Sequence, residues 1–581
     1  MFPELSLIKL EYMHKVIISI AVALFFFYLP LQASTATHPL PSTVNRPLSK
    51  NENQEFRDMV IAYVRAVANH KILHLPLAKS QLNERWGWNP WKRSNWSVQV
   101  VIYYHGNKIG EGSACDNHLE EVVQIATEKA LAHTTLPKIT AKELAEFRFQ
   151  VSFAYYPTQY YAFIEYLDKG LELLGNRVAI RLLDTQLIKQ QLINSQHYLL
   201  NLMHPMLHGY GKFYNAKEDI RPDQLRTIYS SSSLYTFIKL YHFNHNQQLE
   251  KHFKSIANFI LSMQVPSGPN AGGFYYSYNL KTNQKSNYIV VGTTAKTIFT
   301  LLELYQLYNE ETYLIAAKKA GDWLLSMVSE DGKVTVKAKY ENNIWQYKQQ
   351  QSFLYSGQVL SALSRLYAVT KDQRYYDGAT KIAKRLKDEA EKQNLFVGDD
   401  YRDKNTISTS WVLMSMIDYA KINQDEVYRE LIRQLSNVIL SMQITNSHDA
   451  YVYGRYWDAT TPSGNGWLNE VIGNLYEFCK NTHLTDCQQY RKPMILTARW
   501  LIQNAYTKAN TYDVKNPSQA IGGFITLSNS QTVRTDAVCH GVNSLISLLN
   551  IVGDKEQVLL VVPERPLTEI LPSLREGNGF S

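Results

Sequence analysis

The sequence predicts a mainly helical protein, in which six helical hairpins close into an (α/α)6 toroid behind a small α+β domain. Three observations support this fold class. The chain has 581 residues, of which 45% are hydrophobic, so it can bury a sizeable core. Between about residues 188 and 556 a helix-ending phrase recurs every roughly 60 residues, which indicates stacked helical units. Residues 53–187 instead contain alternating apolar stretches that are typical of strands.

Residues 16–29, VIISIAVALFFFYL, form an unbroken apolar run behind Lys9 and Lys15 and ahead of small residues that end near Ala36. A positive start, a short apolar core and a small-residue exit are typical of a secretory signal. A membrane span needs about 20 apolar residues, so an uncleaved anchor is the second interpretation and a buried helix the third. We expect residues 1–36 to direct the protein to the periplasm or outside the cell, with no membrane contact beyond this signal.

The four cysteines are too few for a small fold built on disulfides. Cys479 and Cys487 bracket a short polar loop, CKNTHLTDC, between two predicted helices. Since oxidising compartments retain such bonds, we expect these two to form a disulfide. Cys115 and Cys539 are expected to remain single thiols.

Residues 53–187 mix helix and strand patterns. A helical stretch comes first, and the alternating segment WSVQVVIYYHGNKIGEG breaks at Gly106, as a hairpin does. A second helical stretch follows, and EFRFQVSFAYYP alternates again. NRVAIRLLD is a further strand candidate. The pattern indicates a small α+β domain.

The order of these pieces resembles the AMMECR domain family. KIGEGSA and the stretch TLPKITAKELAEFRFQVSF carry the resemblance. The family's Arg-Gly-Cys-Ile-Gly run is absent, and Gly110, Glu111 and Gly112 stand in its place. The family has no settled reaction, so the resemblance implies a fold for residues 53–187 and leaves their role open; we expect an accessory domain.

Each repeat from about residue 188 onward has the same order of parts. A charged amphipathic helix ends on the recurring phrase, a Gly- and Tyr-rich loop follows, and a more apolar helix opens at Thr, Ser or Asp, which are helix-capping residues. We expect the charged helices outside and the apolar ones inside. Closure into a ring would leave no apolar end exposed, and an open solenoid is the alternative. Residues 563–581 are expected to form a polar tail. The recurring phrases are YLLNLM, FILSMQ, WLLSMV, VILSMQ, WLIQNA and a weaker KIAKRLKDEA.

In such a ring, the loops that enter the inner helices meet at one mouth. Aromatic side chains gather in these loops, and flat rings with polar edges suit sugar faces. Arginines there could bind an anionic sugar or form structural ion pairs. The predicted substrate-binding residues are Tyr275, Tyr276, Tyr355, Trp411, Tyr453, Arg455, Trp467, Arg534 and His540.

Carboxylates occur at the same level. Asp400 lies in VGDDYRD, Glu470 is expected to open an inner helix after Trp467, and Asp536 to open the last one. Cleavage of a glycosidic bond usually needs two carboxylates, so these three are the candidate catalytic residues. A helix cap is the alternative role for each aspartate. No cofactor and no metal are predicted.

The segment SGQVLSALSRLYAVTKDQRYYDGATKIA resembles sugar-epimerase toroids, and residues 188–556 resemble the six-hairpin glycosidase superfamily. That resemblance implies an exported carbohydrate-active enzyme of the hydrolase, lyase or epimerase type, with a neutral or an anionic glycan as substrate. A non-catalytic glycan- or protein-binding toroid is the alternative.

Cys539, His540 and Gly541 also resemble a run in lanthionine-cyclase-like toroids, which implies a zinc-dependent enzyme as a third possibility. The second cysteine of that family is missing, because Leu468 follows Trp467. The net charge of +8 is dispersed along the chain, which argues against nucleic-acid binding.

Overall fold

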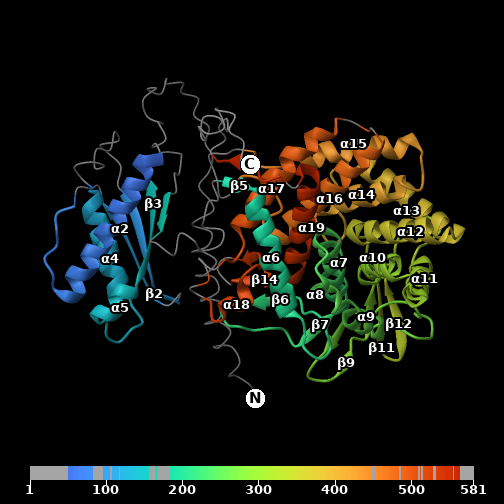
Figure 1. Cartoon of the computed structure of the whole chain (residues 1–581), viewed down its shortest axis with the longest axis horizontal. Coiled ribbons are helices and arrows are strands. Elements are labelled where there is room, and N and C mark those ends of the chain that lie inside the picture. Colours follow the sequence, from blue (N-terminus) through green and yellow to red (C-terminus); the bar gives the residue numbers. More distant parts are fainter. Residues whose placement is uncertain are drawn as a thin grey trace, which may run out of the picture.

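The computed structural model describes residues 50–562, apart from 81, 83–95, 105–106, 117, 156–163, 168–181, 446–451, 483, 485, 508–510, 512–513, 528–530 and 554. The apolar run at 16–29 and the polar tail from 563 lie outside the described residues. Two separate hydrophobic cores are present, one within residues 60–151 and one within 183–562. Figure 1 shows them as a small blue unit with a sheet and a larger helical unit. Within the described part of the chain, no helix is long and apolar enough to cross a membrane.

The first unit is α+β, as predicted. Its four-stranded antiparallel sheet has the order β2-β1-β3-β4. Helix α4 packs on β1 and β2. Gly110 and Gly112 permit this close approach, because a Cβ on either would collide with the α4 backbone at Ala130 or Ala126. The elements are α2 (Lys50–Leu73), β1 (Trp96–Tyr104), β2 (Asn107–Asp116), α4 (Leu119–Ala132), α5 (Ala141–Glu146), β3 (Arg148–Tyr155) and β4 (Ile164–Leu167).

The larger unit is a closed ring of helix pairs, which confirms the (α/α)6 toroid. Each inner helix packs on the next one along the chain, and the last packs on the first, so an open solenoid is excluded. The inner helices are α7 (Thr227–Asn244), α10 (Val291–Tyr308), α12 (Phe353–Thr370), α14 (Thr406–Ala420), α16 (Pro462–Thr482) and α19 (Thr535–Val552). The outer helices are α6 (Thr185–Leu202), α9 (Phe253–Ser262) with the short α8 (Gln247–Glu250), α11 (Glu311–Ser326), α13 (Gln373–Lys392), α15 (Glu426–Ser441) and α17 (Arg491–Gln503).

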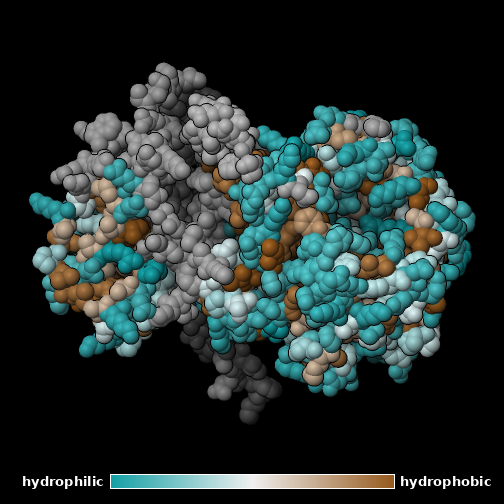
Figure 2. Space-filling model, viewed as in Figure 1, coloured by the Kyte–Doolittle hydropathy of each residue, from teal (hydrophilic) through white to brown (hydrophobic). Residues whose placement is uncertain are grey.

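Burial separates the two kinds of helix as the sequence predicts. Every residue of α14 is buried except Ile407, whereas α13 buries a single face of Tyr, Gly, Ala, Ile and Leu side chains. The outer helix α17 is the exception, because it is buried from Met494 to Gln503, Arg499 included. The surface of the helical unit in Figure 2 is mainly hydrophilic. The predicted capping occurs at two inner helices: the side chains of Ser352 and Asn405 accept hydrogen bonds from backbone N–H groups in the first turns of α12 and α14. The helices α7, α10 and α19 begin without a side-chain cap, which corrects the prediction for them.

Small sheets hold the chain where it enters the inner helices. One sheet joins β7 (Gln224–Arg226), β8 (Ser277–Asn279) and β9 (Gln284–Lys285), and a second joins β10 (Tyr288–Val290), β11 (Lys337–Glu341) and β12 (Ile344–Lys348). A third joins β6 (Phe213–Asn215), β13 (Ile525–Leu527) and β14 (Thr532–Arg534). Since β7, β10 and β14 run directly into α7, α10 and α19, these sheets surround the N-terminal ends of the inner helices.

The two ends of the helical unit are tied to each other. The strand predicted in NRVAIRLLD is β5 (Leu182–Asp184), and it pairs with β15 (Val558–Val561) of the toroid rather than with the first sheet. The Thr185 backbone N–H donates to the Gln557 carbonyl. The remaining short helix of this region is α18 (Pro517–Ala520).

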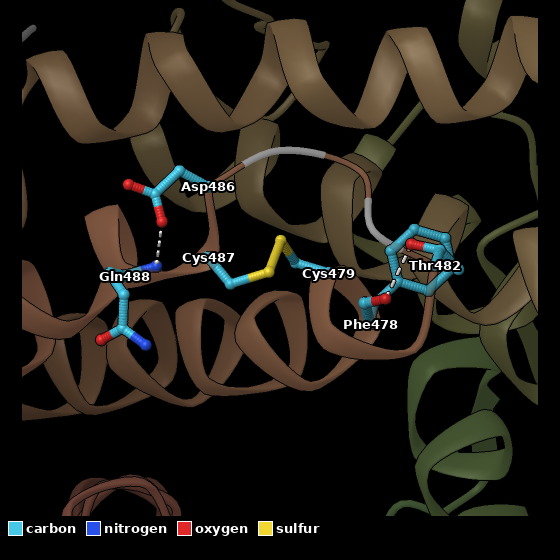
Figure 3. The surroundings of a disulfide bond; sticks show 6 residues. All are labelled: Phe478, Cys479, Thr482, Asp486, Cys487 and Gln488. Carbon is cyan, nitrogen blue, oxygen red and sulfur yellow. Dashed lines mark hydrogen bonds between the residues drawn. A yellow bond between two sulfur atoms is a disulfide. The ribbon is translucent and has the colours of Figure 1, made fainter.

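The predicted disulfide is present. Cys479, near the end of α16, bonds to Cys487 at the start of the 3-10 helix η3 (Cys487–Tyr490), across the connection drawn in Figure 3. Cys115 and Cys539 are free, the first exposed and the second buried. The bond therefore fixes the connection from α16 to the outer helix α17.

Replacing both Cys479 and Cys487 by Ser should lower the free energy of unfolding by about 2–3 kcal/mol, because a closed loop of this length restricts the unfolded chain. Denaturant unfolding of the two proteins measures the difference. Cys115→Ser, which removes an exposed free thiol, is the control and should match the parent. Equal midpoints for the double variant and the parent would contradict the expectation.

Candidate active site

A cavity of about 490 Å³ opens at the N-terminal ends of the inner helices. The sixth residue of every inner helix lines it, so that six side chains form one ring. The second or third residues form a layer above them, because positions three or four apart share a helix face. The ring of sixth residues consists of Ser232, Lys296, Gln358, Trp411, Trp467 and His540.

Two tryptophans form one wall of the cavity. The rings of Trp411 and Trp467 stack with centroids 3.8 Å apart, and the Trp467 Nε1–H donates to Ser410 Oγ at 2.9 Å. The Lys296 ammonium lies 5.3 Å and 5.4 Å from the two ring centroids. Burial lowers the pKa of this lysine. The wall thus combines flat aromatic surface with a fixed cation.

His540 is held by a buried carboxylate. Its Nδ1 lies 2.7 Å from Glu470 Oε2, and the Asn543 side chain donates to the other carboxylate oxygen at 3.1 Å. Burial opposes ionisation of Glu470, but the hydrogen bond and charge of His540, with Lys239 and Lys296, lower its pKa to about 2. An ionised carboxylate only accepts hydrogen bonds, so in the neutral imidazole the hydrogen lies on Nδ1 and Nε2 keeps the lone pair. Such a ring can take up and return a proton.

Arg534 and Asp536 form a second fixed pair. Arg534 donates from Nε to Oδ1 at 2.9 Å and from an NH2 group to Oδ2 at 2.5 Å, and it also reaches the Tyr229 hydroxyl at 3.4 Å. Burial would raise the pKa of Asp536, yet the hydrogen bonds from Arg534 hold it below the ordinary value. Asp536 therefore stays ionised and bound to a cation.

The cavity carries more positive than negative charge. Lys212, Lys296, Arg402 and Arg534 line it, whereas Asp536 is the single carboxylate among the lining residues. Burial and the neighbouring charges of Arg534 and Arg226 lower the pKa of Lys212, which shows how closely these cations are gathered. Six helix N-termini add further partial positive charge. The lining residues therefore carry a net positive charge.

Most of the predicted site residues meet in this cavity. Tyr276, Tyr355, Trp411, Trp467, Arg534, Asp536 and His540 all line it, and Glu470 lies behind His540. Asp536 is the second residue of α19, as expected. Glu470 does not open its helix: α16 starts at Pro462, so Glu470 lies two turns in and contacts the cavity through His540.

Besides Glu470, four predicted residues are outside the lining set, and their side chains have other contacts. Asp400 accepts a hydrogen bond from the Gln351 N–H at 2.8 Å, next to Asp399, which accepts one from Phe353. Tyr275 is half-buried, with the Lys285 ammonium 5.4 Å from its ring.

The other two lie in the loop before α16. Tyr453 is fully buried, and its carbonyl accepts a hydrogen bond from Arg499 at 2.5 Å. Arg455 donates to the carbonyls of Tyr456 and Trp457 at 3.2 Å and 3.1 Å. These side chains pack and brace the loop.

The arrangement around Cys539 does not match a zinc site. Its thiol lies 3.7 Å from Ser233 Oγ, and burial raises its pKa to about 12. Cys479 and Cys487 are bonded to each other and cannot replace the missing ligand. Among the described residues, the one group of three potential metal ligands is the largely exposed set Asp116, His118 and Glu121 of the first unit.

Sequence reasoning missed several cavity residues, including Lys212, Tyr229, Lys296, Gln358 and Arg402. A signal existed for Lys296, which is the one basic residue of the mainly apolar inner helix VGTTAKTIFTLLELYQLY, whose other charged residue is Glu303. Lys212 and Arg402 lie in loops, whose paths the repeat pattern does not define.

One segment of the toroid matches a known protein family. Residues 233–410 match the family model described as Glycosyl hydrolase family 76. This segment runs from within α7 to within α14 and carries Lys296, Tyr355 and Arg402. The match supports the prediction of a carbohydrate-active enzyme of the hydrolase or epimerase type. No curated protein matches the chain.

Solved structures with helical rings are similar at low identity. An α-1,6-mannanase from Salegentibacter sp. HEL1_6 is 14% identical, covering 63% of this chain and 99% of its own, with a TM-score of 0.46. Cellobiose 2-epimerase from Bacillus thermoamylovorans B4167 is 12% identical, with coverage of 63% and 99% and a TM-score of 0.47. An α-mannanase from Bacteroides thetaiotaomicron is 14% identical, with coverage of 63% and 95% and a TM-score of 0.48. At these values neither a reaction nor a substrate is carried over to this chain.

Gly466→Ala should destabilise the protein by about 1–3 kcal/mol, because the new Cβ would lie 2.8 Å from the Gly541 nitrogen and 3.1 Å from the His540 carbonyl carbon. Unfolding in denaturant measures this change. Gly464→Ala on the same helix is the control, because its Cβ would meet only side-chain atoms, the nearest at 3.3 Å. If both variants unfold alike, the close contact of α16 and α19 at Gly466 contributes nothing.

Glu470→Gln should change how stability depends on pH. A carboxyl whose folded pKa is about 2, below the ordinary 4.5, stabilises the folded state above pH 4.5, and this stabilisation is lost as the pH falls toward 2. The stability advantage of the parent over the variant should therefore shrink by on the order of 1–2 kcal/mol between pH 7 and pH 3. Denaturant titrations of both proteins at the two pH values measure it, and an unchanged difference would show that folding does not lower the pKa of Glu470.

Proposed function

We propose that the cavity is the active site of an exported enzyme that acts on an acidic glycan, with His540 as the proton-transfer residue. One observation carries this proposal: a histidine with its Nδ1 bound to the buried Glu470 faces a cavity lined by four cations. The cations suit a sugar carboxylate or another anionic sugar group. The stacked Trp411 and Trp467 supply apolar surface beside them.

The charges favour proton abstraction next to a carboxylate. Cations neutralise the substrate carboxylate, so the hydrogen on the adjacent carbon becomes more acidic, and His540 Nε2 can remove it. In an elimination, the C–H electrons form a carbon–carbon double bond as the neighbouring glycosidic C–O bond breaks. The leaving oxygen then needs a proton. Tyr229 lines the cavity, and burial raises its pKa, so its hydroxyl keeps a proton that it can donate.

Return of a proton to the other face of the same carbon would give epimerisation instead. Both reactions use the same cations and the same histidine, and they differ in whether the C–O bond breaks. Elimination and epimerisation are thus two outcomes of one proposed step.

Hydrolysis is the second candidate, and the family match over residues 233–410 favours it. Hydrolysis usually uses two carboxylates, one acid and one base or nucleophile. Asp536 is bound by Arg534, and Glu470 reaches the cavity through His540, so two free carboxylates do not face each other among the lining residues. The charge balance therefore favours the first candidate.

Export and the accessory domain belong to the same proposal. The apolar run at 16–29 has the pattern of a secretory signal, and the Cys479–Cys487 bond is of a kind that oxidising compartments retain. We also propose that the predicted domain at residues 53–187, without β5 and the start of α6 that belong to the toroid, is an AMMECR-like accessory domain. The glycine-dependent packing of α4 on β2 supports this proposal.

His540→Ala should reduce turnover by roughly 10²–10⁴-fold while leaving the fold intact, because it removes the proton acceptor. The assay follows polygalacturonate, alginate and hyaluronate by the ultraviolet absorbance of unsaturated products, by new reducing ends and by sugar configuration. His197→Ala, an exposed histidine on α6, is the control and should retain activity.

New reducing ends without unsaturated products would favour hydrolysis. Full activity of His540→Ala would overturn the assignment of His540. Binding without turnover by the parent protein would instead favour the non-catalytic toroid.

A further inference from the structure

Outside the cavity, basic side chains pack on the faces of tyrosine rings. Tyr276, on the cavity wall, stacks on Tyr288 with centroids 5.0 Å apart. The Arg226 guanidinium lies 4.6 Å from the Tyr276 centroid, and the Lys337 ammonium lies 4.0 Å from that of Tyr288. These four residues form a row that leads from the cavity to strand β11, beside α10 in Figure 1.

A second row begins on the neighbouring part of the wall. Tyr355 lines the cavity, and its ring makes a T-shaped contact with the ring of Tyr401, with centroids 6.4 Å apart. The Lys348 ammonium lies 5.1 Å from the Tyr401 centroid. Tyr401 is 44% exposed and Lys348 is exposed, so this row is open to solvent.

The two rows meet on one hairpin. Lys337 of β11 and Lys348 of β12 are direct partners in the antiparallel register. Like charges at opposed positions destabilise a sheet. Burial and the charges of Lys339 and Lys348 lower the pKa of Lys337, which records the same repulsion. Within the described part of the chain, no ion pair joins either Lys337 or Lys348 to a carboxylate, whereas Lys339 binds Glu341 at 2.9 Å.

The rings hold these cations in place. Tyr276 contacts both Arg226 and Tyr288, and Tyr288 in turn contacts Lys337, so the cationic groups are ordered before any ligand arrives. Ordered cations lose less side-chain entropy when they bind an anion. An array of this kind, unpaired and continuous with an anion-binding cavity, fits repeated negative charges.

We propose that Arg226, Lys337 and Lys348 form an outer binding surface for an acidic polysaccharide, whose flanking sugar units lie on the rim while one unit occupies the cavity. This inference rests on the proposed function, and it adds that the substrate is a polymer with regularly spaced anionic groups. In this proposal the cavity binds one acidic sugar unit, and the outer binding surface provides the preference for a polysaccharide.

The experiment measures binding and turnover separately in the full chain. The Lys337→Ala/Lys348→Ala variant should raise the KM for polygalacturonate or alginate by roughly fivefold or more at low ionic strength, and by less for a trisaccharide of the same sugar. Added salt should reduce the difference. Lys339→Ala/Lys281→Ala removes the same charge from lysines that are paired with Glu341 and Asp223, and it is the matched control.

The binding part uses the His540→Ala background and affinity electrophoresis in gels that contain the same polymers. The Lys337/Lys348 variant should be retarded less than the matched control, whether or not the parent protein turns the polymer over. Equal retardation of the two variants, or no retardation of the parent by any polymer, would overturn the rim proposal. Equal binding of duplex DNA and polysaccharide would also overturn it, because the surface would then respond to negative charge alone. Loss of turnover with retained rim-dependent binding would contradict only the proposed reaction.

Discussion

The packing of α19 between α16 and α7 is the contact on which the rest of the larger unit depends. It closes the ring, so all six inner helices present their N-terminal ends to one mouth. The closure needs helices that approach to backbone distance, and Gly466 opposite Gly541 permits this. Once the ring is closed, the sixth residue of each inner helix faces the same space. Six unrelated side chains thereby become one site without any local motif.

Equivalent positions of the inner helices also come together deeper in the ring, where they carry charged side chains. The thirteenth residues of α7, α10, α12 and α14 are Lys239, Glu303, Arg365 and Asp418, which are all charged. Arg365 binds Asp418 at 2.9 Å, and the Asp418 side chain is 2% exposed. Burial alone would lower the pKa of Lys239, but Tyr235, Glu470 and Glu303 raise it. Charges below the cavity are thus balanced within the protein, as burial requires. The four cations that line the cavity have one carboxylate, Asp536, among them. This contrast is the physical basis for our proposal that the ligand carries negative charge.

The sequence predicts the parts of this design that depend on local patterns. Apolar periodicity and capping residues locate the helix pairs, and the short spacing of Cys479 and Cys487 predicts their bond. Asp536, Trp411 and Trp467 were predicted because they follow loops that enter inner helices. The sequence does not place the loop residues Asp400, Tyr275, Tyr453 and Arg455, because their roles depend on contacts within the folded loops. Asp400 and Arg455 bind backbone groups, the Tyr275 ring contacts Lys285, and Tyr453 is buried. Glu470 was predicted to open its inner helix, but it lies two turns inside α16, which begins at Pro462.

The cavity residues come partly from the segment that matches a glycosidase family and partly from the rest of the chain. The segment that matches Glycosyl hydrolase family 76 ends at residue 410, and it supplies Lys296, Tyr355 and Arg402. The groups that can handle protons come from beyond it: Glu470 on α16, and Asp536 and His540 on α19. In our proposal the matched part supplies binding surface, and the proton-transferring groups lie outside it: His540 in the seam between the last two inner helices, and Tyr229 on α7 just before residue 233. In that seam Arg534 fixes Asp536 as an ion, and Glu470 fixes the tautomer of His540. Of these three groups, His540 alone has a nitrogen left to exchange a proton with a substrate, so the proposed proton transfer depends on that ring.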